Sequence, residues 1–212
     1  MFNGLLPNSI NVFLDQSKIN NMDRVQEINK YAFVVIKPDA MKQFLDIPIV
    51  QELSRFGLQI IKYKIIKLNK DQVATIYKEK LNENYYPLLE EFLTGSSSTC
   101  LLLKSEGDAI KKSHEFKDEI RRKFKIKSFN ISDTDLELLK LGKHPQQEEI
   151  TKEMAIENLI HAANNFEEVL ENIKKILNQE DLNDIREREP KLYRLFLEHC
   201  GKIERYKELP RR

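Results

Sequence analysis

Short apolar runs separated by amphipathic stretches are the feature that most restricts how this chain can fold. Tyr31–Ile36 (YAFVVI) and Thr99–Leu103 (TCLLL) are continuous runs typical of buried strands. Leu58–Leu68 (LQIIKYKIIKL) alternates apolar residues with lysines, which predicts a strand with one face in water and a bulge where the phase changes. Glu157–Ala162 (ENLIHA) is a fourth short run, so the chain favours one small sheet.

Helical periodicity fills the intervals between these runs. Residues 46–56 form one predicted helix, stopped by Gly57, and Asn69–Gln72 resembles a capping box opening a second helix through Leu81. Further helices are expected at 88–95 and 108–124, and from Asn165 to Leu177. This order predicts an α/β (α+β) fold: a ferredoxin-like βαββαβ sandwich with one small antiparallel sheet, extra helices and a C-terminal helical extension.

Three parts are expected along the chain. Residues 1–29 form an N-terminal extension, residues 30–178 the folded domain and residues 179–212 a C-terminal helical extension. Residues 125–150 lack clear periodicity and are interpreted as a long insertion. A charged linker is expected after residue 178, followed from Pro190 by an amphipathic helix that could dock a protein partner. The apolar side of that helix carries Leu192, Phe196, Cys200 and Ile203.

Charge and cysteine content exclude several classes of protein. The chain has 35 lysines and arginines against 34 aspartates and glutamates, which argues against a dedicated nucleic-acid binder. Its two cysteines, Cys100 and Cys200, cannot build a disulfide framework or a Cys-rich zinc site, and they suit a reducing compartment. No apolar run is long enough to span a bilayer, and no secretory signal is recognisable. We therefore expect a cytoplasmic protein that does not contact membranes.

The glycines exclude the common phosphate-binding loops. There are six, and no two lie closer than twelve positions. The Walker A loop, the Rossmann turn and the hydrolase nucleophile elbow all need more closely spaced glycines. A nucleotide site in this chain would therefore have to hold phosphates with side chains.

Two segments could carry chemistry. The first, Ile36–Ala40 (IKPDA), leaves the first strand, and Pro38 keeps Lys37 in extended backbone. The second, Asn158–Asn164 (NLIHAAN), puts His161 in an apolar strand before a capped helix whose N-terminus would favour an anion. On pattern alone, a hydrogen-bonded core histidine is the favoured interpretation of His161.

These segments resemble the signatures of one enzyme family. Lys37-Pro38-Asp39 resembles the V-K-P-D-G motif of nucleoside diphosphate kinases, and Asn158–His161 resembles their N-x-x-H, in which the histidine is the phosphorylated nucleophile. Weaker matches lie between them in the same order, and the resemblance covers about residues 30–178. These matches are Ile76-Tyr77 (H-Y in the family), Asn84-Tyr85-Tyr86 (P-F-F), Thr94-Gly95 (S-G), Glu106-Gly107 (E-G) and Ile120–Phe124 (I-R-G-D-F).

The resemblance implies a phosphotransferase that moves the γ-phosphate of a nucleoside triphosphate to a nucleoside diphosphate through a phosphohistidine at His161. It implies that Lys37 contacts the transferred phosphate, that Tyr77 donates its hydroxyl nearby and that Arg121 holds the phosphate chain. Asn158 would bind the ribose and Tyr85 would stack on the base, with broad base specificity. Mg²⁺ would arrive on the nucleotide, without protein ligands of its own. Tyr77 could instead be an aromatic residue of the core, and Arg121 could belong to a solvated basic face. Tyr86 could be the stacking ring in place of Tyr85.

The chain also departs from the family pattern. Ala163 stands where a serine is usual, and Asn172 where a glutamate orients the histidine. The interval between Glu106-Gly107 and Ile120-Arg121 is shorter than the family's phosphate-binding helix and trimer loop, so a second phosphate-binding arginine has no clear match. We therefore expect a homo-oligomer smaller than a hexamer, a dimer. His114, His144 and His199 show no ligand spacing and are interpreted as surface residues.

Three functions remain open at this point. One is a working nucleoside diphosphate kinase, which intact Lys37, Asn158 and His161 favour. Another is a catalytically weak or inactive nucleotide-binding module with a structural or regulatory role in a larger assembly, which Ala163 and Asn172 favour. The last is a related phosphotransferase or nucleotide-modifying enzyme with another acceptor.

Overall fold

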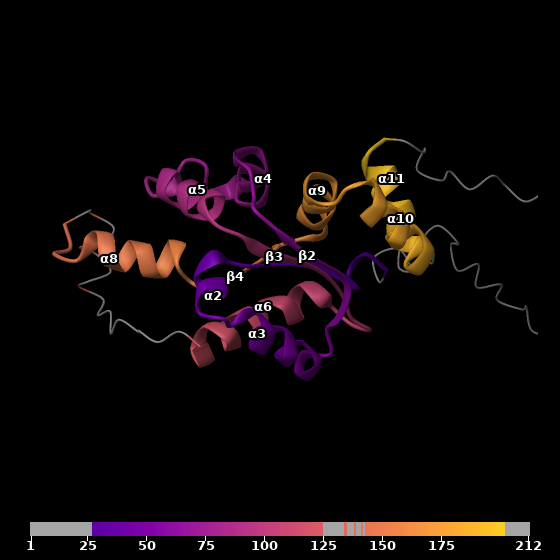
Figure 1. The fold of residues 1–212 in the computed structure, drawn as a ribbon, viewed down its shortest axis with the longest axis horizontal. Helices are drawn as coiled ribbons and strands as arrows, with labels where there is room; N and C mark the ends of the chain where they lie inside the picture. Colours follow the sequence, from indigo (N-terminus) through magenta and orange to yellow (C-terminus); the bar gives the residue numbers. More distant parts are fainter. Residues whose placement is uncertain (1–26, 125–133, 135–137, 139–140, 142, 202–212) are drawn as a thin grey trace, which may run out of the picture.

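A small antiparallel sheet forms the centre of the molecule (Figure 1). The computed structural model describes residues 27–124, 134, 138, 141 and 143–201, so the expectations for the N-terminal extension, most of the insertion and Ile203 lie largely outside it. The strands are β1 (Tyr31–Ile36), β2 (Gln59–Ile66), β3 (Ser98–Lys104) and β4 (Ile160–Ala162), in the order β2-β3-β1-β4. All three strand pairings are antiparallel, as the ferredoxin-like prediction requires.

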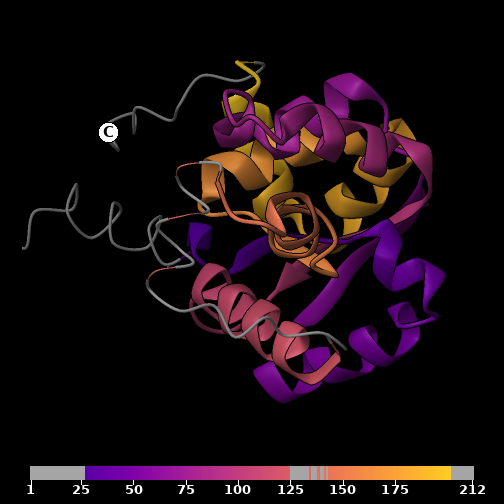
Figure 2. The same ribbon diagram turned by 90° about the vertical axis from the view of Figure 1, so that its left-hand side faces the viewer.

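Helices cover both faces of the sheet (Figures 1 and 2). On one face lie α2 (Pro38–Lys42), α3 (Asp46–Glu52), η1 (Leu53–Phe56) and α6 (Ala109–Phe124). On the other lie α4 (Lys70–Ile76), α5 (Tyr86–Gly95), α9 (Phe166–Ile176), α10 (Gln179–Arg188) and α11 (Pro190–His199). β1 is buried along its whole length because alternate side chains enter the two cores, which explains its continuous apolar sequence.

Local signals for helix ends are confirmed at several positions. Asn69 and Gln72 form a reciprocal capping box at the start of α4, and the Asn165 side chain accepts a hydrogen bond from Glu168 N at the start of α9. Gly57 ends η1 with a φ of 63°, which glycine adopts without a steric penalty. The prediction that the α4 helix continues to Leu81 is wrong. The backbone leaves the helix at Tyr77, and a short 3₁₀ turn, η2 (Lys78–Lys80), follows.

β2 has one face in water, as predicted, and that face carries apolar side chains. A bulge does lie between Ile60 and Lys62, but the apolar side chains of Tyr63 and Ile65 are 41% and 55% exposed. The lysines face inward instead, because α10 supplies carboxylates to meet them. Lys62 Nζ lies 2.8 Å from Asp181 and 2.7 Å from Asp184, and Lys64 Nζ lies 2.5 Å from Asp181.

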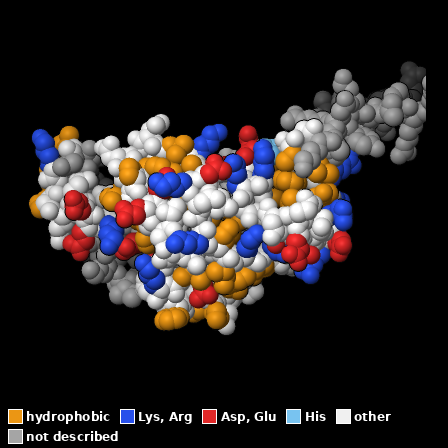
Figure 3. Space-filling model, turned by 45° about the horizontal axis from the view of Figure 1, so that its top comes forward, with side chains coloured by type: hydrophobic (Ala, Val, Ile, Leu, Met, Phe, Trp, Pro, Cys, Tyr) orange, Lys and Arg blue, Asp and Glu red, His pale blue; other side chains and the backbone are white. Residues whose placement is uncertain are grey.

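The region after residue 178 is helical, not a linker. Asn178 and Asp181 form a capping box that opens α10. In α11, Leu192 and Phe196 are buried in the same core as the sheet and α9. The apolar side expected to dock a partner is therefore used within this chain. The outer face over α4, α5 and α9 carries basic and acidic side chains interspersed (Figure 3).

Candidate functional site

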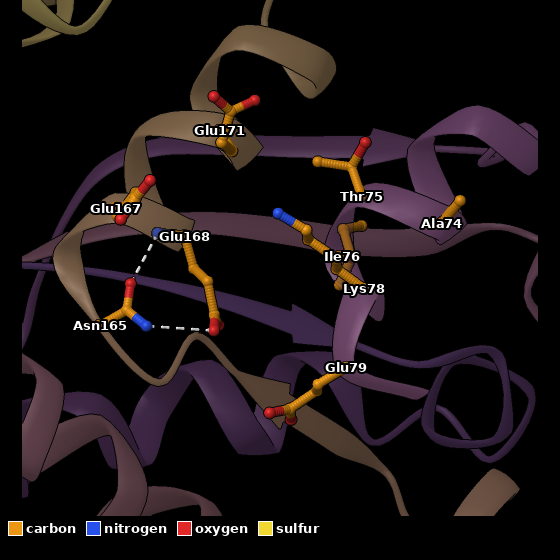
Figure 4. Close-up of a pocket in the computed structure, with 9 residues that line it drawn as sticks. All are labelled: Ala74, Thr75, Ile76, Lys78, Glu79, Asn165, Glu167, Glu168 and Glu171. Carbon is orange, nitrogen blue, oxygen red and sulfur yellow. Dashed lines mark hydrogen bonds between the residues drawn. The ribbon is translucent and has the colours of Figure 1, made fainter. Parts of the chain in front are cut away.

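Two neighbouring cavities flank η2, and Glu79 lines both of them. The larger, about 570 Å³, lies between α4 and α9 and has glutamates 167, 168 and 171 on one wall and Thr75, Lys78 and Glu79 on the other (Figure 4). Such a wall repels a polyphosphate. The smaller, about 370 Å³, is within the size range of ligand pockets and is lined by Lys37, Lys80, Lys117, Arg121 and His161. The smaller cavity is therefore the candidate site for an anionic ligand.

His161 occupies the middle of β4 and is half-buried beside Tyr77, with the two ring centroids 4.5 Å apart. Its Nε2 is buried and makes no hydrogen bond to any described residue, so Nδ1 is the ring nitrogen left to meet solvent. Burial, together with the positive charges of Lys37, Lys117 and Arg121, holds the pKa of His161 well below its usual range. The imidazole is therefore neutral at pH 7, the form in which histidine is a nucleophile.

The turn that delivers His161 is strained. Ile160 N donates to Asn158 O over 2.8 Å, and Leu159 between them has a φ of 68°. This combination defines a γ-turn of positive φ, a rare conformation for a branched side chain. Strain of this kind costs on the order of 1–3 kcal/mol and persists only when the surroundings enforce it.

The segment after β1 supplies part of that enforcement. Lys37 lies in extended backbone before Pro38, and its amide donates to Leu159 O over 2.8 Å. Asp39, in the first turn of α2, accepts a hydrogen bond from Leu159 N at Oδ2 over 2.8 Å. Burial raises the pKa of Asp39. The two segments singled out in the sequence are thus bound directly to each other.

Arg121 provides the other hydrogen bonds that hold the strained turn. Its Nε donates to Asn158 O over 3.1 Å and its Nη2 donates to Ile160 O over 2.8 Å. The guanidinium therefore spans the γ-turn from the α6 side. The interpretation of Arg121 as a solvated basic face is wrong, because its side chain is engaged with the turn at the edge of the cavity.

Two further predicted residues surround the ring of His161. The Lys37 side chain is 1% exposed, donates to Ile156 O over 3.0 Å at the end of the π-helical turn η3 (Lys152–Ile156), and lies 5.4 Å from the centroid of Tyr77. The Tyr77 hydroxyl is buried and has no hydrogen-bond partner among the described residues. Burial raises the pKa of Tyr77 well above its usual value, so the hydroxyl keeps its proton. A ligand oxygen in the cavity could satisfy this donor.

Tyr85 and Asn158 complete the wall. Tyr85 is half-buried and lines the cavity, whereas Tyr86 is packed in the core. All six residues predicted for the site, namely Lys37, Tyr77, Tyr85, Arg121, Asn158 and His161, line this one cavity.

Sequence reasoning missed two residues of α6. The helix predicted over residues 108–124 is present as α6, which is 16 residues long. On it, Lys117 lines the cavity and lies 2.9 Å from Nδ1 of His114, whose Nε2 lies 3.2 Å from Ala163 O. His114 is thus no simple surface residue, and neither is His199, which pairs with Glu171 over 2.6 Å. The spacing of His114 and Lys117, three apart on a predicted helix, was the available signal.

The expected departures are visible in the structure. Asn172 is 1% exposed, and its Oδ1 has no hydrogen-bond partner in the described part of the chain. Ala163 is buried after β4 and offers only backbone groups.

Within the described ranges, no group of three or more His, Cys, Asp or Glu side chains could hold a metal ion. Cys100 and Cys200 are free thiols. No helix in those same ranges has the length and apolarity needed to cross a bilayer.

A neutral histidine presented to a cationic cavity at the edge of a small α+β sheet is typical of a kinase that transfers phosphate between nucleotides. Comparison with known proteins agrees with this class. The family model described as nucleoside diphosphate kinase matches residues 30–138, more than half of the chain. The chain belongs to the nucleoside diphosphate kinase family.

Individual relatives support the same conclusion. A nucleoside diphosphate kinase of Saccharolobus solfataricus is 26% identical over 150 residues, covering 71% of this chain and 96% of the relative. One from Methanobrevibacter smithii is 31% identical over 75 residues, or 35% of this chain and 50% of the relative. A nucleoside-diphosphate kinase from Borrelia burgdorferi, solved as a transition state mimic with bound vanadate and ADP, shares the fold. Its TM-score is 0.50 at 16% identity, covering 72% of this chain and 89% of that one.

The family model stops before the strained turn. Its matched range includes Lys37, Tyr77, Tyr85 and Arg121 but ends at residue 138, ahead of Asn158 and His161. The family match is therefore carried by residues 30–138, and the role of the histidine depends on the geometry of the cavity.

Proposed function

We propose that this chain transfers the γ-phosphate of a nucleoside triphosphate to a nucleoside diphosphate through a phosphohistidine at His161. The observation that carries the proposal is the juxtaposition of a neutral His161 with Lys37, Lys117 and Arg121 around one cavity. A neutral imidazole can attack phosphorus, and the cations can neutralise the charge that the transferred phosphoryl group carries.

In the first step, the lone pair of His161 Nδ1 attacks the γ-phosphorus. The bond between that phosphorus and the β,γ-bridging oxygen breaks, and its electron pair leaves on the nucleoside diphosphate. In the second step, the terminal oxygen of an acceptor diphosphate attacks the phosphohistidine, and Nδ1 recovers its electron pair. The two steps are the reverse of each other, so one set of cations serves both.

The other residues bind and orient the nucleotide. Lys37 contacts the transferred phosphoryl group, and the Tyr77 hydroxyl donates to one of its oxygens. Asn158 binds the ribose and Tyr85 stacks on the base. Arg121 holds the phosphate chain with the guanidinium N–H groups that do not donate to the γ-turn. Mg²⁺ is carried by the nucleotide phosphates and lowers their repulsion. The cavity fits this arrangement because cations and one carboxylate, Glu79, face it in the described structure.

The direct test is to mix the pure protein with γ-labelled ATP and Mg²⁺ and look for label on the protein. We expect acid-labile, alkali-stable label that leaves when any nucleoside diphosphate is added. His161→Ala should remove the label while leaving the circular dichroism spectrum unchanged. His144→Ala, a histidine away from the cavity, is the matched control. Label that persists in His161→Ala would eliminate the histidine mechanism.

A second function, binding of nucleotide without turnover, is favoured by Asn172. The imidazole Nε2 has no partner among the described residues, and a buried amide stands where the family has a carboxylate. A poorly oriented ring would transfer phosphate slowly. Nucleotide binding measured by calorimetry, with no label on the protein after hours, would establish this alternative. A cytoplasmic location also remains a prediction, which the free thiols accommodate.

A further inference from the structure

Lys117 and Lys80 are the two lysines of the cavity that are absent from the predicted site residues, and Lys117 is the one that comes from α6. It extends from the middle of α6 into the cavity that contains His161. Its positive charge contributes more to lowering the pKa of His161 than Arg121 does. Lys117 and the histidine that would receive a phosphoryl group therefore face the same cavity.

The contacts of His114 fix how Lys117 is held. Nε2 of His114 lies 3.2 Å from Ala163 O, a carbonyl that can only accept, so Nε2 must carry the ring proton. Nδ1 is then an acceptor, and it accepts from Lys117 Nζ over 2.9 Å. His114 thus ties Lys117 to the backbone directly after β4. An ammonium has three protons, and this contact uses one of them.

Arg121 is less available than Lys117. Two of its three guanidinium nitrogens donate to the carbonyls of Asn158 and Ile160 in the γ-turn. Burial and the neighbouring charge of Arg121 also lower the pKa of Lys117, whereas Asp118 and Glu79 raise it. An anion in the cavity would relieve the repulsion between the two cations.

We propose that Lys117, positioned by His114, binds the β- and γ-phosphates of the nucleotide, while Arg121 serves mainly to brace the turn that carries His161. The proposal rests on the nucleotide site proposed above. It assigns the missing second phosphate-binding cation to a lysine, held by a histidine from the preceding turn of the same helix.

The test is the dependence of binding on phosphate number, measured by calorimetry with ADP and AMP on the full chain. In Lys117→Met we expect ADP binding to weaken about 10- to 100-fold, the range for loss of a charge-assisted hydrogen bond. AMP has no β-phosphate, so its affinity should change less than about 3-fold. Lys117→Arg keeps the charge and should recover most of the ADP affinity. Lys111→Met, an exposed lysine on the same helix, is the matched control.

His114 is tested by the same discrimination. His114→Phe should lower the preference for ADP over AMP, whereas His114→Gln, which keeps a donor and an acceptor, should retain part of it. Equal losses for ADP and AMP in Lys117→Met, or no loss, would overturn the proposal. Because binding is measured, this result is independent of labelling. An unlabelled wild type with an intact ADP preference refutes only the phosphohistidine.

Discussion

The protonation state of His161 has a measurable consequence. Burial and the surrounding cations lower its pKa, so the neutral nucleophile persists below pH 6.5, where an ordinary histidine becomes protonated. We expect the initial rate of labelling from ATP to stay level as the pH falls from 8 to 6. A rate that halves near pH 6.5 would show that the ring titrates as it does in water. Acid-labile label should be quantified after an alkaline quench.

Asp39 holds the strained turn through one hydrogen bond. Asp39→Ala leaves the buried amide of Leu159 without its acceptor, so we expect a loss of about 1–3 kcal/mol in the free energy of unfolding. Asp39→Asn keeps an acceptor oxygen and should lose less. Urea unfolding monitored by circular dichroism gives both values. Equal stability of Asp39→Ala and wild type would mean that water replaces the carboxylate.

The resemblance to the kinase family, and not the residue pattern alone, predicted which side chains meet in the cavity. Lys37 and His161 come from segments more than a hundred residues apart, yet Lys37 directly follows β1 and His161 lies in the neighbouring strand β4. The hydrogen bonds of Arg121 to the turn could not be predicted, because they depend on how α6 lies against β4. The pairing of Lys117 with His114 also follows from that packing. The chemical roles of these residues remain predictions.

At the scale of elements, α10 is docked on β2 by charge. Hydrogen bonds from Lys62 and Lys64 outweigh the burial of Asp181 and lower its pKa from 3.8 to about 2. A carboxylate with a depressed pKa stabilises the fold above the unfolded value, and this contribution is lost as the pH falls from about 3.8 toward 2.

This predicts a specific acid sensitivity. Asp181→Asn should lower the free energy of unfolding at pH 6 but have a much smaller effect near pH 2, where about half of the wild-type carboxylate is protonated and most of its stabilising contribution is lost. Urea unfolding at the two pH values checks it. Asp184→Asn, the more exposed partner of Lys62, is the milder comparison. An equal loss at both pH values would show that the carboxylate charge is not what docks α10.

Elements defined by local signals were predicted well. β1 has the predicted bounds, and the caps at Asn69 and Asn165 open the helices as expected. The alternation of β2 does not show which of its faces is exposed, because the lysines form ion pairs with α10 and the apolar side chains are left at the surface. The lysines face inward because α10 supplies two aspartates to pair with them. The sequence of α10 alone predicts a charged linker, so this pairing could not be foreseen.

At the scale of the whole molecule, β2 is an edge strand with an exposed apolar face. Ile60, Tyr63 and Ile65 on β2 are 40%, 41% and 55% exposed, and Ile47 on α3 is 64% exposed. An edge with unpaired backbone groups and apolar side chains favours association with another chain. The expected dimer would bury these residues against their copies in a second subunit.

Light scattering on the pure protein should therefore give a mass of two chains, below that of a hexamer. Ile65→Lys should shift the mass toward one chain, since it places a charge within the apolar face. Leu88→Lys, an equally exposed leucine on α5, should leave the mass unchanged. A dimer that survives Ile65→Lys would place the interface elsewhere.

The γ-turn before His161 limits how the proposed site could be transferred to another protein. Asn158–His161 is four residues long, but its shape depends on Lys37 and Asp39 after β1 and on Arg121 of α6. Grafted alone onto another loop, the tetrapeptide would relax to an ordinary backbone conformation, and the histidine side chain would no longer be held in this orientation. A graft that keeps the shape of the turn would need β1 with the residues that follow it, β4 and the end of α6. The four-residue motif therefore indicates where the site lies but does not determine its geometry.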